Sequence, residues 1–237
     1  YTIIGGYYTV AQIDQFQAIF LLLMVILVPS VAFTHLPNGF EGIIETAKKL
    51  DISLQLFPTG SFFEILMLLQ ISLGWGLGYF GQPHIITKFM GIKSPEELVK
   101  SKYLGISWQI ISLTAAATVG LIGISYFNGF MNNPELVFVE MVKQLFHPFI
   151  GGFILCAVLA ASMSTMDSQI LVCASIISED FFKHLFKRHA SQKELLLISR
   201  IGVLLVSLIA LLIAFDRSTS LMDAVYYAWA GLGASFG

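Results

Sequence analysis

Five long apolar segments constrain the fold of this chain more than any other feature. A helix needs about 20 predominantly apolar residues to cross the hydrocarbon core of a bilayer. The segments that qualify are Phe16–Phe33, Phe62–Met90, Leu104–Phe127, Leu145–Ile177 and Leu195–Phe215. A sixth begins near Leu221, and residues 1–10 look like the end of an earlier helix. Because the chain begins without Met and stops at Gly237 inside an apolar stretch, we expect a piece of a longer all-α membrane protein.

The composition supports lipid rather than water as the solvent. Apolar residues make up 56% of the 237 positions, charged residues make up 12%, and the mean hydropathy is +0.80. Soluble domains carry about 25% charged residues. The net charge of -2, without a basic block that has interleaved aromatic residues, argues against a nucleic-acid partner. Cys156 and Cys173 have no metal-site spacing and are expected to be buried as small apolar residues.

The basic residues of the connecting loops predict the orientation in the bilayer. Loops 87–103 and 178–200 carry nine Lys and Arg, whereas loops 34–61, 128–144 and 216–220 carry four. Cytoplasmic loops are enriched in Lys and Arg, so the first two loops are predicted to be cytoplasmic. No separate soluble domain is evident, although residues 42–50 could form a short helix outside the membrane.

The first informative span is interrupted by a glycine cluster. Four glycines and a proline fall between Gly74 and Pro83, and these residues destabilise a helix by up to about 1 and 3 kcal/mol each. Interrupted helices mark binding sites in many transporters, because their free backbone groups can face a solute. Trp75, Tyr79 and Pro83 have the spacing of one helical face and would form an aromatic wall for a small zwitterion. The alternatives are helix packing through Gly74 and Gly78 or an interfacial aromatic belt.

The second informative span, Leu145–Ile177, has a polar belt at residues 160–169. At about 1.5 Å per residue the span would be roughly 50 Å long, so it must tilt, break or project. Ala161, Ser164 and Thr165 lie on one predicted face and would offer neutral oxygens to a sodium ion, a hard cation. We expect the helix to unwind here. The alternative is that the hydroxyls bond to carbonyls of their own helix or to a neighbouring helix.

Two acidic residues lie in or near these apolar segments. An ionisable residue within a membrane is a functional candidate. Asp14 precedes an outward-running helix and could instead sit at the cytoplasmic interface. Asp167 lies deeper, and we expect it to attract the cation without being a direct ligand.

Several motifs resemble the sodium/proline branch of the sodium:solute symporter family. They are Leu73-Gly-Trp-Gly-Leu-Gly-Tyr-Phe-Gly-Gln-Pro-His-Ile85, Met163-Ser-Thr165 with Gln169 and Leu171-Val-Cys173, Glu179-Asp180, the loop 189–195, Tyr1-Thr2 with Gly5-Gly6, and Tyr227-Ala-Trp-Ala-Gly231. The resemblance implies a leucine-transporter-like inverted-repeat helical bundle. Residues 1–237 would then be a single transmembrane domain fragment with the end of core helix 4, helices 5 to 9 and the start of helix 10.

The same resemblance implies the residue roles. Trp75, Tyr79 and Pro83 would fall at proline-site positions, and Ala161, Ser164 and Thr165 at sodium-site positions. Asp14 would match an acid on the inner sodium path. Asp167 departs from relatives that have a neutral residue there, so its role stays open.

We therefore expect sodium entry coupled to L-proline uptake by alternating access, in a bacterial inner membrane. The partners would be proline, sodium and the lipid bilayer, with no cofactor and no enzymatic chemistry. The alternatives are a sodium-coupled symporter of the same fold for another solute, a channel, or a substrate-sensing membrane receptor. A channel would need pore-lining polar residues from several helices, whereas polarity here is concentrated in two spans.

Overall fold

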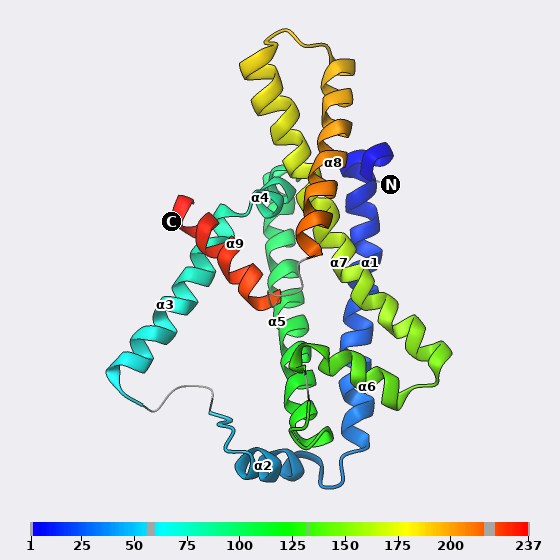
Figure 1. Ribbon diagram of the computed structural model, residues 1–237, viewed down its shortest axis with the longest axis vertical. Coiled ribbons are helices and arrows are strands. Elements are labelled where there is room, and N and C mark those ends of the chain that lie inside the picture. Colours follow the sequence, from blue (N-terminus) through cyan, green and yellow to red (C-terminus); the bar gives the residue numbers. More distant parts are fainter. Residues whose placement is uncertain (1, 56–59, 132, 216–220, 237) are drawn as a thin grey trace. The chain divides into compact units, whose positions relative to one another are not determined.

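The computed structural model describes residues 2–55, 60–131, 133–215 and 221–236, and the regular structure in these ranges is entirely helical (Figure 1). The helices form two compact units. One unit comprises residues 12–57 and 94–164, and the other comprises residues 1–11, 58–93 and 165–237. Helices α1 (Thr2–Thr34) and α7 (Pro148–Ser175) each contribute to both units. The prediction of an all-helical protein is confirmed for the described residues.

The unit of residues 12–57 and 94–164 is organised around one apolar core. Besides parts of α1 and α7 it contains α2 (Gly39–Lys49), α5 (Pro95–Tyr126), the 3-10 turn η2 (Pro134–Leu136) and α6 (Val137–Leu145). Met141 and Val142 of α6 are fully buried, and they pack with Val28 of α1 and Ile122 of α5. The short helix predicted at residues 42–50 is confirmed as α2, which packs on α5.

The other unit contains α3 (Phe62–Gly78), the 3-10 turn η1 (Tyr79–Gly81), α4 (Pro83–Met90), the π-helix η3 (Ile176–Phe186), α8 (Gln192–Ala214) and α9 (Leu221–Phe236). Two contacts organise it: α3 packs against α9, and η3 packs against α8. The small core beneath α8 consists of Ile170, Ala174 and Val203.

Four of the described helices are long and apolar enough to cross a membrane. They are Gly5–Thr34, Pro95–Tyr126, Pro148–Phe186 and Gln192–Ala214, and the bent pair α3–α4 makes a fifth if it is one span. Large apolar side chains such as Phe62, Leu104 and Ile213 are mostly exposed on these helices. In water such surface would be unfavourable, whereas lipid chains cover it.

Two predicted helix boundaries are wrong because local signals were passed over. Helix α5 begins at Pro95 rather than at Leu104, because the Ser94 hydroxyl caps it by accepting from the Glu97 N–H at 3.4 Å. Most of the loop expected at residues 87–103 is therefore helical. Helix α1 also runs without a loop through residues 11–15, and it bends instead at Gly6, which has a φ of 59° and a ψ of -157°. A residue with a side chain rarely adopts this φ.

The predicted interruption of the first span is confirmed, but it lies at the end of the glycine cluster. Helix α3 continues through Gly74 and Gly78, and η1 and the extended residue Gln82 then separate it from α4. The axes of α3 and α4 differ by 49°. Pro83 favours a break at this position, because steric clash disfavours the helical region for the residue before a proline.

The predicted unwinding at residues 160–169 is wrong. Helix α7 is continuous from Pro148 to Ser175. A helix tolerates hydroxyls when they bond to its own carbonyls, as Ser162 does by donating to the Val158 carbonyl at 3.0 Å. The irregular winding comes later, in the π-helix η3. The long span thus projects as a hairpin rather than breaking at its centre.

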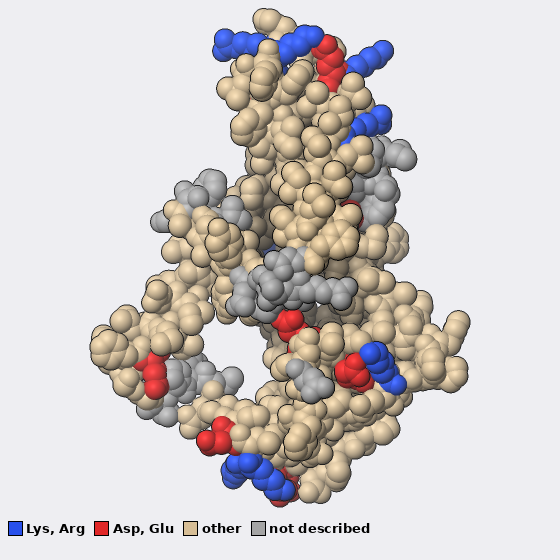
Figure 2. Space-filling view, in the orientation of Figure 1, with Lys and Arg blue, Asp and Glu red and all other residues tan. Residues whose placement is uncertain are grey.

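The hairpin of η3 and α8 carries a concentration of charge at its end (Figure 2). Lys183 forms an ion pair with Glu179 at 2.9 Å, and Lys187 pairs with Glu194. Glu194 also accepts from the Ser191 N–H, while the Ser191 hydroxyl accepts from the Glu194 N–H, so the two residues form a capping box. A charged end of this kind suits the aqueous boundary of a membrane. The cytoplasmic assignment of this loop stays a prediction.

Candidate functional site

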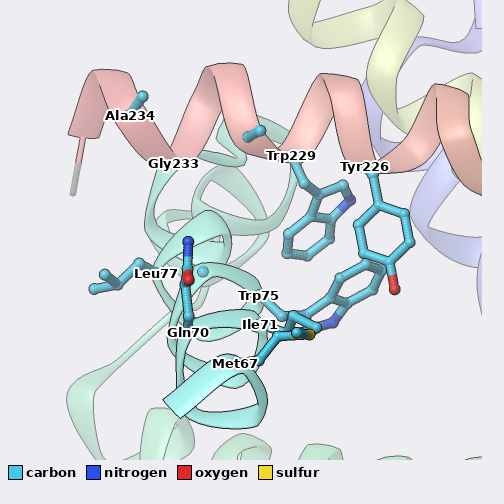
Figure 3. A pocket seen from close by; sticks show the side chains of 11 residues that line it. Met67, Gln70, Ile71, Trp75, Leu77, Tyr226, Trp229, Gly233 and Ala234 are labelled. Atoms are coloured by element: carbon cyan, nitrogen blue, oxygen red, sulfur yellow. The ribbon is translucent and has the colours of Figure 1, made fainter. Parts of the chain in front are cut away.

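A cavity of about 460 Å³ lies between α3 and α9 (Figure 3). This volume falls within the range of small-molecule sites, roughly 300 to 1,000 Å³. Helix α3 contributes Met67, Gln70 and Trp75 to the lining, and α9 contributes Tyr226 and Trp229. The lining is therefore mostly apolar and aromatic, with the Gln70 amide and the Tyr226 hydroxyl as polar groups.

Trp75 is the centre of an aromatic cluster at this cavity. Its indole stacks on that of Trp229 with ring centroids 4.6 Å apart and planes 5° from parallel. Tyr226 meets Trp75 edge-on at 5.8 Å, and Figure 3 shows both α9 side chains reaching toward Trp75. Aromatic faces of this kind bind the apolar ring of a solute and can attract an ammonium group.

The close approach of α9 to α3 depends on small residues at the contact. A Cβ built on Gly78 would lie 2.4 Å from Cε3 of Trp229. A Cβ on Gly233 would lie 3.6 Å from Cα of Gly78. The packing role that was the alternative reading of Gly78 is therefore present in the structure. It serves the cavity as well, because it lets Trp229 reach the face of Trp75.

The three residues predicted to form one aromatic wall occupy three different environments. Trp75 lines the α3–α9 cavity. Tyr79 lies in η1 and supports Trp229 edge-on, with ring centroids 4.8 Å apart. Pro83 lies beyond the break and lines a separate cavity of about 640 Å³, together with Tyr7, Thr87 and residues of η3 and α8. The break at Gln82 is the reason, because it ends the helical register that would align Pro83 with Trp75.

Ala161, Ser164 and Thr165 lie within one turn of the continuous helix α7. Ala161 and Ser164 are half-buried, and Thr165 is exposed. The Ser164 hydroxyl, unlike that of Ser162, makes no hydrogen bond within the described part of the chain. The spacing i, i+3, i+4 keeps the three residues on one face, as predicted.

The two acids differ in burial. Asp14 is half-buried in α1. Asp167 is only 7% exposed, and its neighbour Ser168 is 4% exposed. A buried carboxylate within an apolar span is costly unless other groups stabilise it, which makes Asp167 the stronger functional candidate of the two.

Comparison with known proteins identifies the family. The sequence matches the model of the sodium:solute symporter family over residues 1–237. The chain belongs to the sodium:solute symporter family. As a member with several apolar spans, it is part of a multi-pass membrane protein. No solved structure matches the chain significantly.

Two curated relatives of this family member are named for proline transport. The chain is 41% identical over 244 residues to the osmoregulated proline transporter OpuE of Bacillus subtilis, and it is 43% identical over 242 residues to the sodium/proline symporter of Staphylococcus aureus. Both alignments cover all of the chain, but only 48% and 46% of the relatives. The chain thus spans about half the length of the curated relatives it matches.

Trp229 and Tyr226 were not among the site residues predicted from the sequence. Both lie on α9, spaced i, i+3, and both line the cavity with Trp75. The motif Tyr227-Ala-Trp-Ala-Gly231 was noted for its resemblance alone. The spacing of two aromatic residues on one face of an apolar helix was the available signal, but it did not reveal which helix they would meet.

Proposed function

We propose that the protein containing this chain couples sodium entry to L-proline uptake by alternating access, in the cell membrane of a bacterium. The observation that carries this proposal is the aromatic cavity between α3 and α9, which is lined by the Trp75 indole and by aromatic side chains of α9. The names of the two relatives point to the same solute, and one of them names the ion.

Proline suits the cavity on chemical grounds. Its pyrrolidine ring is small and apolar and can lie against the Trp75 indole, while its ammonium can make a cation–π contact. Tyr79 is the second proposed proline-site residue, and it contacts Trp229 of the cavity lining edge-on. Pro83 is the third proposed proline-site residue, and it ends the break that separates α3 from α4.

The sodium ion would bind at one face of α7. The Ala161 carbonyl and the Ser164 and Thr165 hydroxyls are neutral oxygen ligands, which hold a monovalent cation weakly enough to release it again. The Ser164 hydroxyl supports this assignment, because it makes no hydrogen bond within the described part of the chain. Asp14 and Asp167 would attract the cation along its path without being direct ligands.

Coupling requires only differential binding. If sodium binds more tightly to the conformation that also binds proline, each ligand raises the affinity for the other by the same factor. No covalent step is part of this scheme, so the protein acts as a transporter and not as an enzyme.

The test is uptake of labelled L-proline by the full-length protein in vesicles, with and without an inward sodium gradient. We expect accumulation only with the gradient. We expect Trp75→Ala to weaken proline binding roughly tenfold or more, because it removes the aromatic face. Tyr79→Ala should weaken it less, because Tyr79 does not line the cavity. Trp108→Ala on α5 is the matched control, since Trp108 does not line this cavity. Wild-type proline affinity in a folded Trp75→Ala protein would refute the proposed site.

A further inference from the structure

Trp229 covers the face of the Trp75 indole that is turned toward α9, which is where a solute using that face would lie. The two indoles are nearly parallel, with centroids 4.6 Å apart. Carbon atoms in contact are about 3.5 to 4.0 Å apart, so a ring inserted between two indole faces needs them roughly 7 to 8 Å apart. The observed spacing leaves no room for a layer between Trp75 and Trp229.

This stack is built into the packing of the two helices. Gly78 admits the Trp229 ring, since any side chain there would collide with it. Tyr79 holds the same ring edge-on at 4.8 Å. Tyr226 approaches Trp75 from the same helix as Trp229. The aromatic side chains of α9 therefore contact the Trp75 indole as the ring of a solute would.

Part of the contact between α3 and α9 can separate without pulling apart interdigitated side chains. Where Gly233 faces Gly78 and Gly74, the contact is between backbones and not between interdigitated side chains. A small outward movement of α9 would uncover the Trp75 face and enlarge the existing cavity. The stabilisation lost would include the contacts of Trp229 with Trp75, Tyr79 and Gly78.

We propose that Trp229 is a built-in competitor of the solute: its indole occupies the Trp75 face, and the imino acid binds by displacing it. This inference rests on the proposed function and adds a residue to the site on α9. Trp229 is thus a positioning residue that sets the affinity, because each binding event must separate the stacked pair.

The first test compares proline affinities of purified full-length variants. Trp229→Ala removes the competitor, so we expect proline to bind about two- to tenfold more tightly, which corresponds to the usual strength of an aromatic pair. Trp229→Phe keeps a ring on the Trp75 face and should stay near the wild-type affinity. Trp108→Ala is again the matched tryptophan control. Unchanged or weaker proline binding by folded Trp229→Ala would overturn the inference.

A second test needs no destabilising substitution. A stacked indole pair gives a coupled signal in the near-ultraviolet circular dichroism, obtained as the difference between the wild type and Trp229→Phe. Saturating proline should change this difference signal because it removes the coupling between the two indoles, and a difference signal unaltered at saturation would overturn the inference. The two proposals fail separately. If Trp75→Ala weakens binding while Trp229→Ala does not strengthen it, only the displacement is wrong, whereas an unaffected Trp75→Ala protein removes the site itself.

Discussion

Adding a single methyl group at Gly78 tests whether α9 packs on α3 as described. Gly78 has a helical φ of -56°, so alanine is compatible with the backbone. Its Cβ would lie 2.4 Å from Cε3 of Trp229, whereas ordinary contacts are 3.4 to 4 Å. The Trp229 ring must therefore move by about 1 Å or more, and overpacking of this kind costs about 1 to 3 kcal/mol.

Gly76 provides the matched control, because it lies in the same helix and a Cβ there meets nothing within 4 Å. Alanine improves helix propensity by up to about 1 kcal/mol in either position. The difference between the two variants thus isolates the collision with Trp229.

The assay is thermal unfolding of the purified full-length protein at one scan rate, because large proteins often unfold irreversibly. For a protein of the length of the curated relatives the midpoint moves by roughly 1 °C per kcal/mol, so Gly78→Ala should unfold about 1 to 3 °C below Gly76→Ala. Equal midpoints for the two variants would show that Trp229 does not pack against Gly78, and the α3–α9 cavity would lose its basis.

Two further predictions concern α7 and α8. Ser164→Ala and Thr165→Ala should each raise the sodium concentration for half-maximal proline uptake roughly tenfold, the effect of losing one polar contact to a charge. Ser162→Ala should not, because Ser162 does not share the helical face of Ala161, Ser164 and Thr165. Unchanged sodium dependence in both test variants would contradict the sodium assignment. Ser191→Ala should destabilise the first turn of α8 by about 0.5 to 2 kcal/mol by removing the capping box; hydrogen exchange of the amides at 192–195 should become faster, and unaltered protection would contradict this role.

The helices of this family member were largely predictable because their signals are local. Length and apolarity identify the spans, and lipid imposes both requirements. The boundaries that were missed also had local causes. The start of α5 is marked in the sequence by the capping residue Ser94, by Pro95 and by Glu97. The predicted span began at Leu104 instead, because only apolar residues were counted. The sequence thus contained more information about α5 than an apolarity criterion extracts.

The polar belt of α7 was a poorer guide to irregular backbone than Pro83 was, although α1 continues through Pro29. The belt at residues 160–169 was expected to unwind, yet hydroxyls can be satisfied inside a helix, as Ser162 shows. Pro83 has no such option, because it lacks an N–H and restricts the residue before it. The break accordingly falls at Gln82 rather than among the glycines that precede it, which only weaken a helix.

Only the α3 side of the candidate site could be predicted from the sequence, because the two sides are distant in the sequence. Trp75 stands out locally within a glycine cluster, whereas Trp229 is one aromatic residue in an ordinary apolar helix. Only the packing of α9 on α3 brings the two indoles within 4.6 Å. That packing depends on Gly78, which the sequence analysis weighed as either a site signal or a packing signal. The two interpretations of Gly78 describe one arrangement. Because Gly78 lets α9 approach α3, it also brings the α9 aromatic residues to the Trp75 indole. A substitution that loosens this packing must therefore also alter the site.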